Sequence, residues 1–157
     1  MRVGILTLSD TRTPATDESG RVVREVIETL PGAQVVETYL AADNLACIQA
    51  ELIRFSDDVG CDVVLTTGGT GVSPRDVTPE ATMAVCDRLV PGLGEAMRAA
   101  SLSKTPMAMI SRATAGLRGK TLIVNLPGSP KGARECLETI LPVLGHAVKL
   151  AAGESAH

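Results

Sequence analysis

The sequence has almost no aromatic residues: its 157 residues include one tyrosine, one phenylalanine and no tryptophan. Proteins that bind single-stranded nucleic acid commonly stack its bases on aromatic rings, and this chain lacks the rings for such a platform. Its formal net charge of −3 also argues against broad electrostatic binding to nucleic acid. We therefore expect no nucleic-acid partner, and we expect any bound nucleotide base to lie against aliphatic groups and backbone.

Long apolar runs are missing too, since no segment approaches the roughly 18 residues of a membrane span. No signal peptide opens the chain, so we expect a cytoplasmic protein without a membrane partner. The two histidines have no clustered partners, which argues against a histidine metal site. Four cysteines lie in apolar patterns without a C-x-x-C pair, so we expect buried, reduced thiols at Cys47, Cys61, Cys86 and Cys136.

Strand and helix patterns alternate along the chain. The expected strands are residues 2–8, 35–40, 62–67, 106–110 and 121–125. The expected helices are residues 22–30, 43–55, 79–88, 92–103 and 129–148. This alternation predicts an α/β fold with a mostly parallel sheet of about five strands, joined by right-handed crossovers.

Two details of this fold depart from a simple parallel sheet. Only about ten residues, 111–120, separate the fourth and fifth expected strands, which is too short for a crossover helix. We therefore expect this strand pair to be antiparallel or not adjacent. Pro142 lies inside the last expected helix and should kink or divide it.

The most distinctive segment is Thr-Thr-Gly-Gly-Thr-Gly at residues 66–71, at the carboxyl end of the third expected strand. It is not a P-loop, because no Lys-Ser/Thr follows, nor a dinucleotide loop, because Pro74 stands where the third glycine is required. The backbone N–H groups of such a loop can bind phosphate, and α/β sheets bind ligands at this edge. A tight turn without a ligand is the alternative, and the density of glycine and threonine favours a binding loop.

Two aspartates are candidates for charge-dependent chemistry. Thr78 is expected to cap the next helix, with Pro79 at its first position, which leaves Asp76 free to hold Mg²⁺. Asp43 lies where the second expected helix begins, and an aspartate at this place is most often the N-cap. Spacing alone therefore makes Asp43 structural.

Other polar residues follow the remaining strands at the same edge of the sheet. Asp10, Asp17 and Gly20 follow the first strand, and solvated loop residues are their default interpretation. Ser111 and Arg112 begin a loop that carries several cations. In an acidic protein, a local basic group beside a glycine-rich loop favours phosphate binding, although a plain solvated surface is the alternative.

A second strong signal is the run from Asn125 to Lys131, where a strand ends and a helix begins. Ser129 is expected to cap this helix, with Pro130 at the first position. Lys131 in the first turn opposes the helix dipole, which suits an anion bound at the helix N-terminus. Simple capping without a ligand remains the alternative.

Together these residues resemble the molybdopterin adenylyltransferase family of the MogA and MoaB type, which includes the G domains of plant and animal molybdenum-insertion proteins. The resemblance covers about residues 3–153. It rests on seven motifs in the right order: Leu8-Ser9-Asp10, Asp17-x-Ser19-Gly20, residues 66–71, residues 75–81, Pro91-Gly92, Ser111-Arg112-Ala113 and Asn125-Leu126-Pro127-Gly128.

The resemblance implies one doubly wound, molybdopterin-binding-type domain over residues 1–157, with helices on both faces of the sheet; its last few residues are expected to be disordered. It implies a homotrimer that transfers AMP from ATP to the terminal phosphate of molybdopterin, with Mg²⁺, and that hands the product to a molybdenum-insertion protein. The alternative is a non-catalytic molybdopterin-binding or scaffold module of the MoaB-type branch. The intact Arg75-Asp76-Val77-Thr78-Pro79 stretch favours the enzyme.

The resemblance also implies roles for individual residues. Asp43 and Asp76 become the two essential carboxylates and the Mg²⁺ ligands, which reverses the structural role that spacing gives Asp43. The implied nucleotide and molybdopterin contacts are Ser9, Asp10, Gly68, Gly69, Thr70, Gly71, Arg75, Ser111, Arg112, Asn125, Pro127, Gly128 and Ser129.

Overall fold

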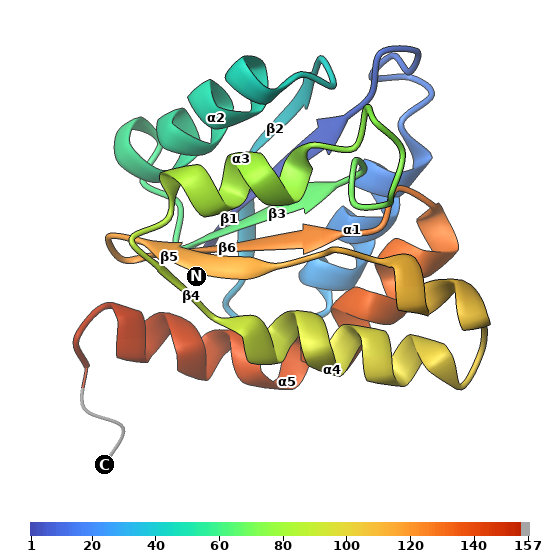
Figure 1. Ribbon diagram of the computed structural model, residues 1–157. Helices are drawn as coiled ribbons and strands as arrows, with labels where there is room; N and C mark the ends of the chain where they lie inside the picture. Colours follow the sequence, from blue (N-terminus) through green and yellow to red (C-terminus); the bar gives the residue numbers. More distant parts are fainter. Residues whose placement is uncertain (155–157) are drawn as a thin grey trace.

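A six-stranded sheet forms the centre of the computed structural model, which describes residues 1–154 (Figure 1). The strands are β1 (Arg2–Leu8), β2 (Gln34–Ala41), β3 (Val63–Thr67), β4 (Arg88–Leu89), β5 (Ala115–Arg118) and β6 (Thr121–Leu126). They lie in the order β2-β1-β3-β6-β5-β4. Strands β1, β2, β3 and β6 are parallel, whereas β5 is antiparallel to both of its neighbours. The predicted α/β fold with a mostly parallel sheet is confirmed, with six strands in place of about five.

Helices cover both faces of this sheet, as expected for a doubly wound domain (Figure 1). One face carries α1 (Glu18–Glu28), α4 (Pro91–Leu102) and α5 (Pro130–Ala151). The other face carries α2 (Leu45–Ile53), its continuation η1 (Arg54–Asp58) and α3 (Thr78–Val85). Helix α5 is not divided at Pro142. The expected disorder of the last residues lies outside the described part of the chain.

Two hydrophobic clusters fill the space between the sheet and its helices. Val63 and Leu65 belong to the cluster under α1, α4 and α5, whereas Val64 belongs to the cluster under α2 and α3. All five residues of β3 are buried, which is why its apolar residues stand at consecutive positions. Each fully buried valine or leucine side chain stabilises the fold by roughly 1.5–3 kcal/mol. The strand that precedes the glycine-rich segment is therefore firmly held.

The prediction of a strand at residues 106–110 is wrong, because this segment forms the 3₁₀ helix η2 (Pro106–Ile110). Pro106 suits a first helical turn, and the Thr105 hydroxyl accepts a hydrogen bond from the Met107 N–H, 3.2 Å away. The antiparallel partner of β6 is instead β5, within residues that we expected to form a loop. A two-residue turn joins β5 to β6, and Gly119 supplies its positive φ of 54°.

The structure also tests the interpretation of the cysteines. All four thiols are free, as predicted, and Cys61 and Cys136 are buried. The predicted burial is wrong for Cys47, which is exposed, and only partly right for Cys86. Burial raises the pKa of the Cys61 thiol to about 11. Within residues 1–154, no helix is both long and apolar enough to cross a membrane.

Candidate functional site

The carboxyl ends of three parallel strands meet at one edge of the sheet. In the register of the sheet, Thr67 of β3 lies between Thr7 of β1 and Leu126 of β6. The loops that follow these strands therefore converge, and a pocket of about 560 Å³ opens between them. Its lining consists of Leu8, Ser9, Asp10, Thr11, Arg12, Asp43, Thr67, Gly68, Gly69, Ser73, Arg75, Asp76, Gly128 and Ser129. We call it the polar pocket.

We call residues 68–71 the glycine loop. Its positions 68 and 69 need glycine for steric reasons. Gly68 and Gly69 have φ angles of 108° and 67°, in the region that side chains disfavour. A Cβ on Gly68 would lie 2.6 Å from the Leu8 carbonyl oxygen, and one on Gly69 would lie 2.3 Å from the Thr78 hydroxyl. A Cβ on Gly128 would lie 3.2 Å from the Gly68 Cα. Three loops thus pack against one another through bare backbone.

Only part of the glycine loop can donate hydrogen bonds to a ligand. The Gly68 N–H already donates to the Leu126 carbonyl, 3.2 Å away. The N–H groups of Gly69, Thr70 and Gly71 have no acceptor among residues 1–154. Free N–H groups at a loop of this kind are suited to binding phosphate oxygens.

Thr78 does not cap α3, so that prediction is wrong. Thr78 is the first residue of the helix, and its hydroxyl donates to the Gly68 carbonyl, 2.9 Å away. Asp76 is not wholly free either, because its Oδ2 accepts a hydrogen bond from the Ser73 N–H at 2.9 Å. Asp76 therefore ties its own loop with one carboxylate oxygen, and the residue also lines the polar pocket.

Asp43 is not a helix cap, so the prediction from spacing is wrong there as well. Asn44 caps α2 instead, and its Oδ1 accepts a hydrogen bond from the Cys47 N–H at 2.9 Å. Because the neighbouring residue takes this role, the Asp43 carboxylate is left to line the polar pocket. Its Oδ1 is buried, and it is the one buried side-chain oxygen or nitrogen in residues 1–154 without a hydrogen-bond partner.

A bound cation would offset the negative charge of the buried, unpartnered Asp43 carboxylate. Burial raises the pKa of Asp43, and the nearby charge of Asp76 raises it further. Residues 1–154 contain no cluster of three or more acidic, histidine or cysteine side chains that could hold a metal. Two carboxylates suit Mg²⁺, which usually takes one or two from the protein and completes its shell with water and substrate phosphates. The residues present therefore fit Mg²⁺, which Asp43 and Asp76 would hold.

The polar pocket also contains two arginines. Arg75 forms an ion pair with Asp10, which in turn accepts a hydrogen bond from the Asp43 N–H at 2.9 Å. Arg12 donates to the Ser19 hydroxyl at 2.6 Å and to the Gly128 carbonyl at 3.3 Å. Our sequence interpretation did not place Arg12 in the site; its position just after a strand at this edge was the available signal.

Asp17 and Gly20 are structural, rather than the solvated loop residues that we expected. Asp17 caps α1 and accepts a hydrogen bond from the Gly20 N–H at 2.9 Å. Its other oxygen accepts from the Thr7 hydroxyl at 2.6 Å. A Cβ on Gly20 would lie 2.2 Å from the Asp17 carboxylate, so this turn needs glycine.

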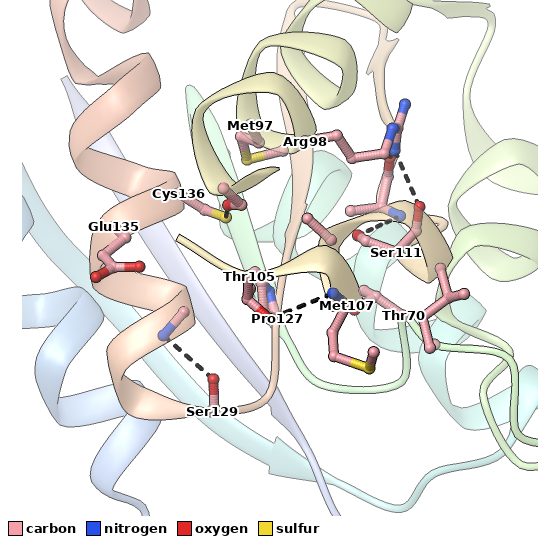
Figure 2. Close-up of a pocket in the computed structure, with 16 residues that line it drawn as sticks. Thr70, Met97, Arg98, Thr105, Met107, Ser111, Pro127, Ser129, Glu135 and Cys136 are labelled. Atoms are coloured by element: carbon pink, nitrogen blue, oxygen red, sulfur yellow. Dashed lines mark hydrogen bonds between the residues drawn. The ribbon is translucent and has the colours of Figure 1, made fainter. Parts of the chain in front are cut away.

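A second pocket, of about 260 Å³, lies among α4, η2 and the start of α5 (Figure 2). We call it the apolar pocket. Thr70 and Gly71 line it, Gly68 and Gly69 line the polar pocket, and Ser129 lines both. Its other lining residues are Met97, Arg98, Ser101, Thr105, Met107, Ala108, Ile110, Ser111, Ala113, Pro127, Gly132, Glu135 and Cys136. Most were missed from the sequence, because α4, η2 and α5 meet only in the folded chain.

The residues that the resemblance implies as ligand contacts lie in the polar pocket, in the apolar pocket or in neither. Nine line the polar pocket: Ser9, Asp10, Asp43, Gly68, Gly69, Arg75, Asp76, Gly128 and Ser129. Thr70, Gly71, Ser111, Pro127 and, again, Ser129 line the apolar pocket. Arg112 and Asn125 line neither pocket.

Asn125 faces the protein interior and is fully buried. Its amide nitrogen donates to the hydroxyls of Thr66 and Thr82, at 3.1 and 2.8 Å. These bonds join β6 to β3 and to α3. The Asn125 side chain therefore holds together the strands and the helix that carry the site.

Comparisons with known proteins find related sequences and structures. A family model described as "probable molybdopterin binding domain" matches residues 4–146. A protein named molybdopterin adenylyltransferase from Helicobacter pylori is 44% identical over 156 residues, which cover 98% of this chain and 89% of that protein. A protein of the same name from Escherichia coli is 41% identical over 152 residues, which cover 94% and 77%. The crystal structure of the molybdopterin biosynthesis enzyme MoaB from Thermus thermophilus has a TM-score of 0.88 and 50% identity, covering 99% of each chain.

Proposed function

The chain belongs to the family described as probable molybdopterin-binding domains, and from this premise we propose that it is a molybdopterin adenylyltransferase of molybdenum cofactor biosynthesis. In this proposal it transfers AMP from ATP to the terminal phosphate of molybdopterin and releases pyrophosphate. Curated relatives of that name, 41% and 44% identical over most of the chain, support the proposal.

One observation carries the proposal: the buried, unpartnered Asp43 oxygen in a pocket that also holds Asp76 and the glycine loop. A module that only bound molybdopterin would gain nothing from two neighbouring carboxylates when burial, and then the charge of Asp76, raises the pKa of Asp43. A nucleotidyl transferase needs such a pair, because the phosphates of its substrate bring a divalent cation with them.

The reaction is a single displacement at phosphorus. A terminal phosphate oxygen of molybdopterin attacks the α-phosphorus of ATP, the new P–O bond forms, and the bond to the β-phosphate breaks as pyrophosphate leaves. The protein needs to provide positioning and charge stabilisation more than covalent chemistry.

Each group at the edge of the sheet has a place in this reaction. The free N–H groups of the glycine loop bind phosphate oxygens on which charge develops. Arg12 and Arg75 line the polar pocket and offset the charge of the phosphates. Asp43 and Asp76 would hold Mg²⁺, which neutralises phosphate charge when it is bound.

The apolar pocket provides room for the heterocyclic ring of one substrate. Its methionine and aliphatic side chains can contact a flat ring without an aromatic residue, as the composition of the chain requires. Because Ser129 lines both pockets, a ring in the apolar pocket and phosphates in the polar pocket can belong to one bound molecule.

The proposal extends to assembly and location. We propose a homotrimer that acts in the cytoplasm, where ATP is available, and passes its product to a molybdenum-insertion protein. Exposed apolar side chains on η2, Met107, Met109 and Ile110, support an interaction surface beside the apolar pocket. Measurement of the molar mass by light scattering tests the trimer.

The direct test mixes the purified protein with ATP, Mg²⁺ and molybdopterin and detects adenylylated product and pyrophosphate by mass spectrometry. Asp43→Asn and Asp76→Asn should each lower the turnover rate by on the order of 100-fold, because each removes charge from the transferring centre. Asp57→Asn is the matched control, since Asp57 pairs with Arg118 outside both pockets. Binding of molybdopterin without consumption of ATP would favour the non-catalytic module.

A further inference from the structure

Arg112 holds the glycine loop through both its backbone and its side chain. Its N–H donates to the Thr70 carbonyl at 2.8 Å. Its Nε donates to the Gly71 carbonyl and its Nη2 to the Asp76 carbonyl, each at 2.7 Å. Nη1 forms an ion pair with Glu80 in the first turn of α3. One residue therefore binds the glycine loop, the Asp76 segment and the following helix together.

These contacts also direct the peptide groups of the loop. The peptide bonds are trans, so the carbonyl and the N–H of each peptide unit point in opposite directions. With the carbonyls of Thr70 and Gly71 turned toward Arg112, the N–H groups of Gly71 and Val72 face away from it. Neither N–H has an acceptor among residues 1–154. The N–H of Gly71, a residue that lines the apolar pocket, is thereby left free for an anionic ligand.

We propose that Arg112 is a positioning residue: it sets the glycine loop and Asp76 in their working geometry without contacting either substrate. The resemblance alone implied a ligand contact. All three guanidinium nitrogens are instead engaged by groups of the protein, and Arg112 lines neither pocket. The kinetic part of this inference rests on the proposed function, whereas its structural part does not.

The planar guanidinium is essential to this role. It donates in three directions at fixed angles, to two carbonyls and one carboxylate, which the single ammonium of a lysine cannot reproduce. The Arg112–Glu80 ion pair by itself would contribute little, because its side chains are 36% and 42% exposed. The bonds to the two loop carbonyls are the contacts that place Asp76.

The test compares Arg112→Lys and Arg112→Gln with Arg118→Lys. Arg118 is a matched control, because it also donates to a carboxylate, that of Asp57, and to a backbone carbonyl, that of Val85. Both Arg112 variants should lower kcat by on the order of 10- to 100-fold, with the KM of ATP and of molybdopterin little changed. Arg118→Lys should change neither quantity.

Amide hydrogen exchange gives a second measurement that needs no turnover. The N–H groups of Ser73 and Asp76 are hydrogen-bonded within the loop, and they should exchange about tenfold faster in Arg112→Lys than in the wild type or the control. If Arg112→Lys proves poorly folded, Glu80→Gln should produce the same change to a smaller extent. Unchanged loop exchange in the folded variants would overturn the inference.

Two kinetic outcomes would also overturn it. A raised KM for either substrate at unchanged kcat would mean that Arg112 contacts that substrate. Recovery by Arg112→Lys of most of the activity lost in Arg112→Gln would mean that charge matters and the directions of the three donors do not. If the wild-type protein forms no adenylylated product, the proposed function fails, and the exchange comparison still decides whether Arg112 holds the loop.

Discussion

Gly69→Ala is the substitution that most directly tests how the glycine loop is built. The new Cβ would lie 2.3 Å from the Thr78 hydroxyl and 3.2 Å from the Asp43 Oδ1. Either the Thr78 hydroxyl leaves the Gly68 carbonyl to which it donates, or the loop moves. Both responses displace backbone beside Asp43, so we expect loss of stability and of activity together.

The magnitude follows from a comparison with Gly119→Ala. Gly119 also has a positive φ, of 54°, but a Cβ there would meet no atom within 4 Å. Both substitutions incur the left-handed backbone strain of about 1–2 kcal/mol. Gly69→Ala should cost about 0.5–1.5 kcal/mol more for the lost hydrogen bond and about 1–3 kcal/mol more for overpacking. Gly69→Ala should therefore be the more destabilising by about 1.5–4.5 kcal/mol if both costs apply.

Urea denaturation measures the free energy of unfolding of the two variants, and the adenylylation assay measures their activity. Gly119→Ala should keep the activity of the wild type, because the β5–β6 turn lies outside both pockets. Gly69→Ala should lose most of it. Equal loss of stability in the two variants, with full activity in Gly69→Ala, would refute the steric reasoning.

Three further substitutions probe other parts of the site. Asp43→Asn, measured with a chelator present, should raise Tm at pH 7. Burial and then the charge of Asp76 raise the pKa of Asp43, so ionisation of this carboxyl lowers the stability of the wild type as the pH rises past the usual aspartate range. The asparagine variant lacks this loss. This gain should vanish near about pH 3, where the carboxyl is protonated in both the folded and the unfolded state. Asn125→Ala should lower the free energy of unfolding by about 2–3 kcal/mol in urea, because buried hydroxyls such as that of Thr82 lose their donor; a smaller loss would mean that water replaces it. Ala108→Phe should fill the apolar pocket and raise the KM of the substrate whose ring binds there. KM values unchanged from the wild type for both substrates would place the ring elsewhere.

Local patterns were sufficient for much of the fold. The apolar run in β3, the cap at Ser129 and the glycine-rich segment after β3 depend on neighbours within a few residues, and each is present as predicted. The strand expected at residues 106–110 failed, because its apolar side chains are largely exposed on a 3₁₀ helix. β5 was missed, because Ala115 and Gly116 have weak strand propensity and form a strand only beside β6.

The aspartates show the limit of spacing arguments. Asp43 and Asn44 are both good caps, and the sequence does not say which of two adjacent residues takes the position. The structure gives the cap to Asn44 and leaves an Asp43 oxygen buried without a partner. Asp76 was expected in the site because Thr78 would cap α3; that reason was wrong, although Asp76 does line the polar pocket.

The sequence by itself determined the class of fold, the glycine loop and the resemblance to a family, because these depend on the order and spacing of nearby residues. Only the tertiary structure decided which side chains line the pockets. Arg112 was expected to contact a substrate, and its guanidinium donates to the glycine loop and lines neither pocket; Asn125 is buried between a strand and a helix. The apolar pocket exists because η2, α4 and α5 meet around it. The direction of a side chain depends on partners distant in the sequence, and no local pattern records them.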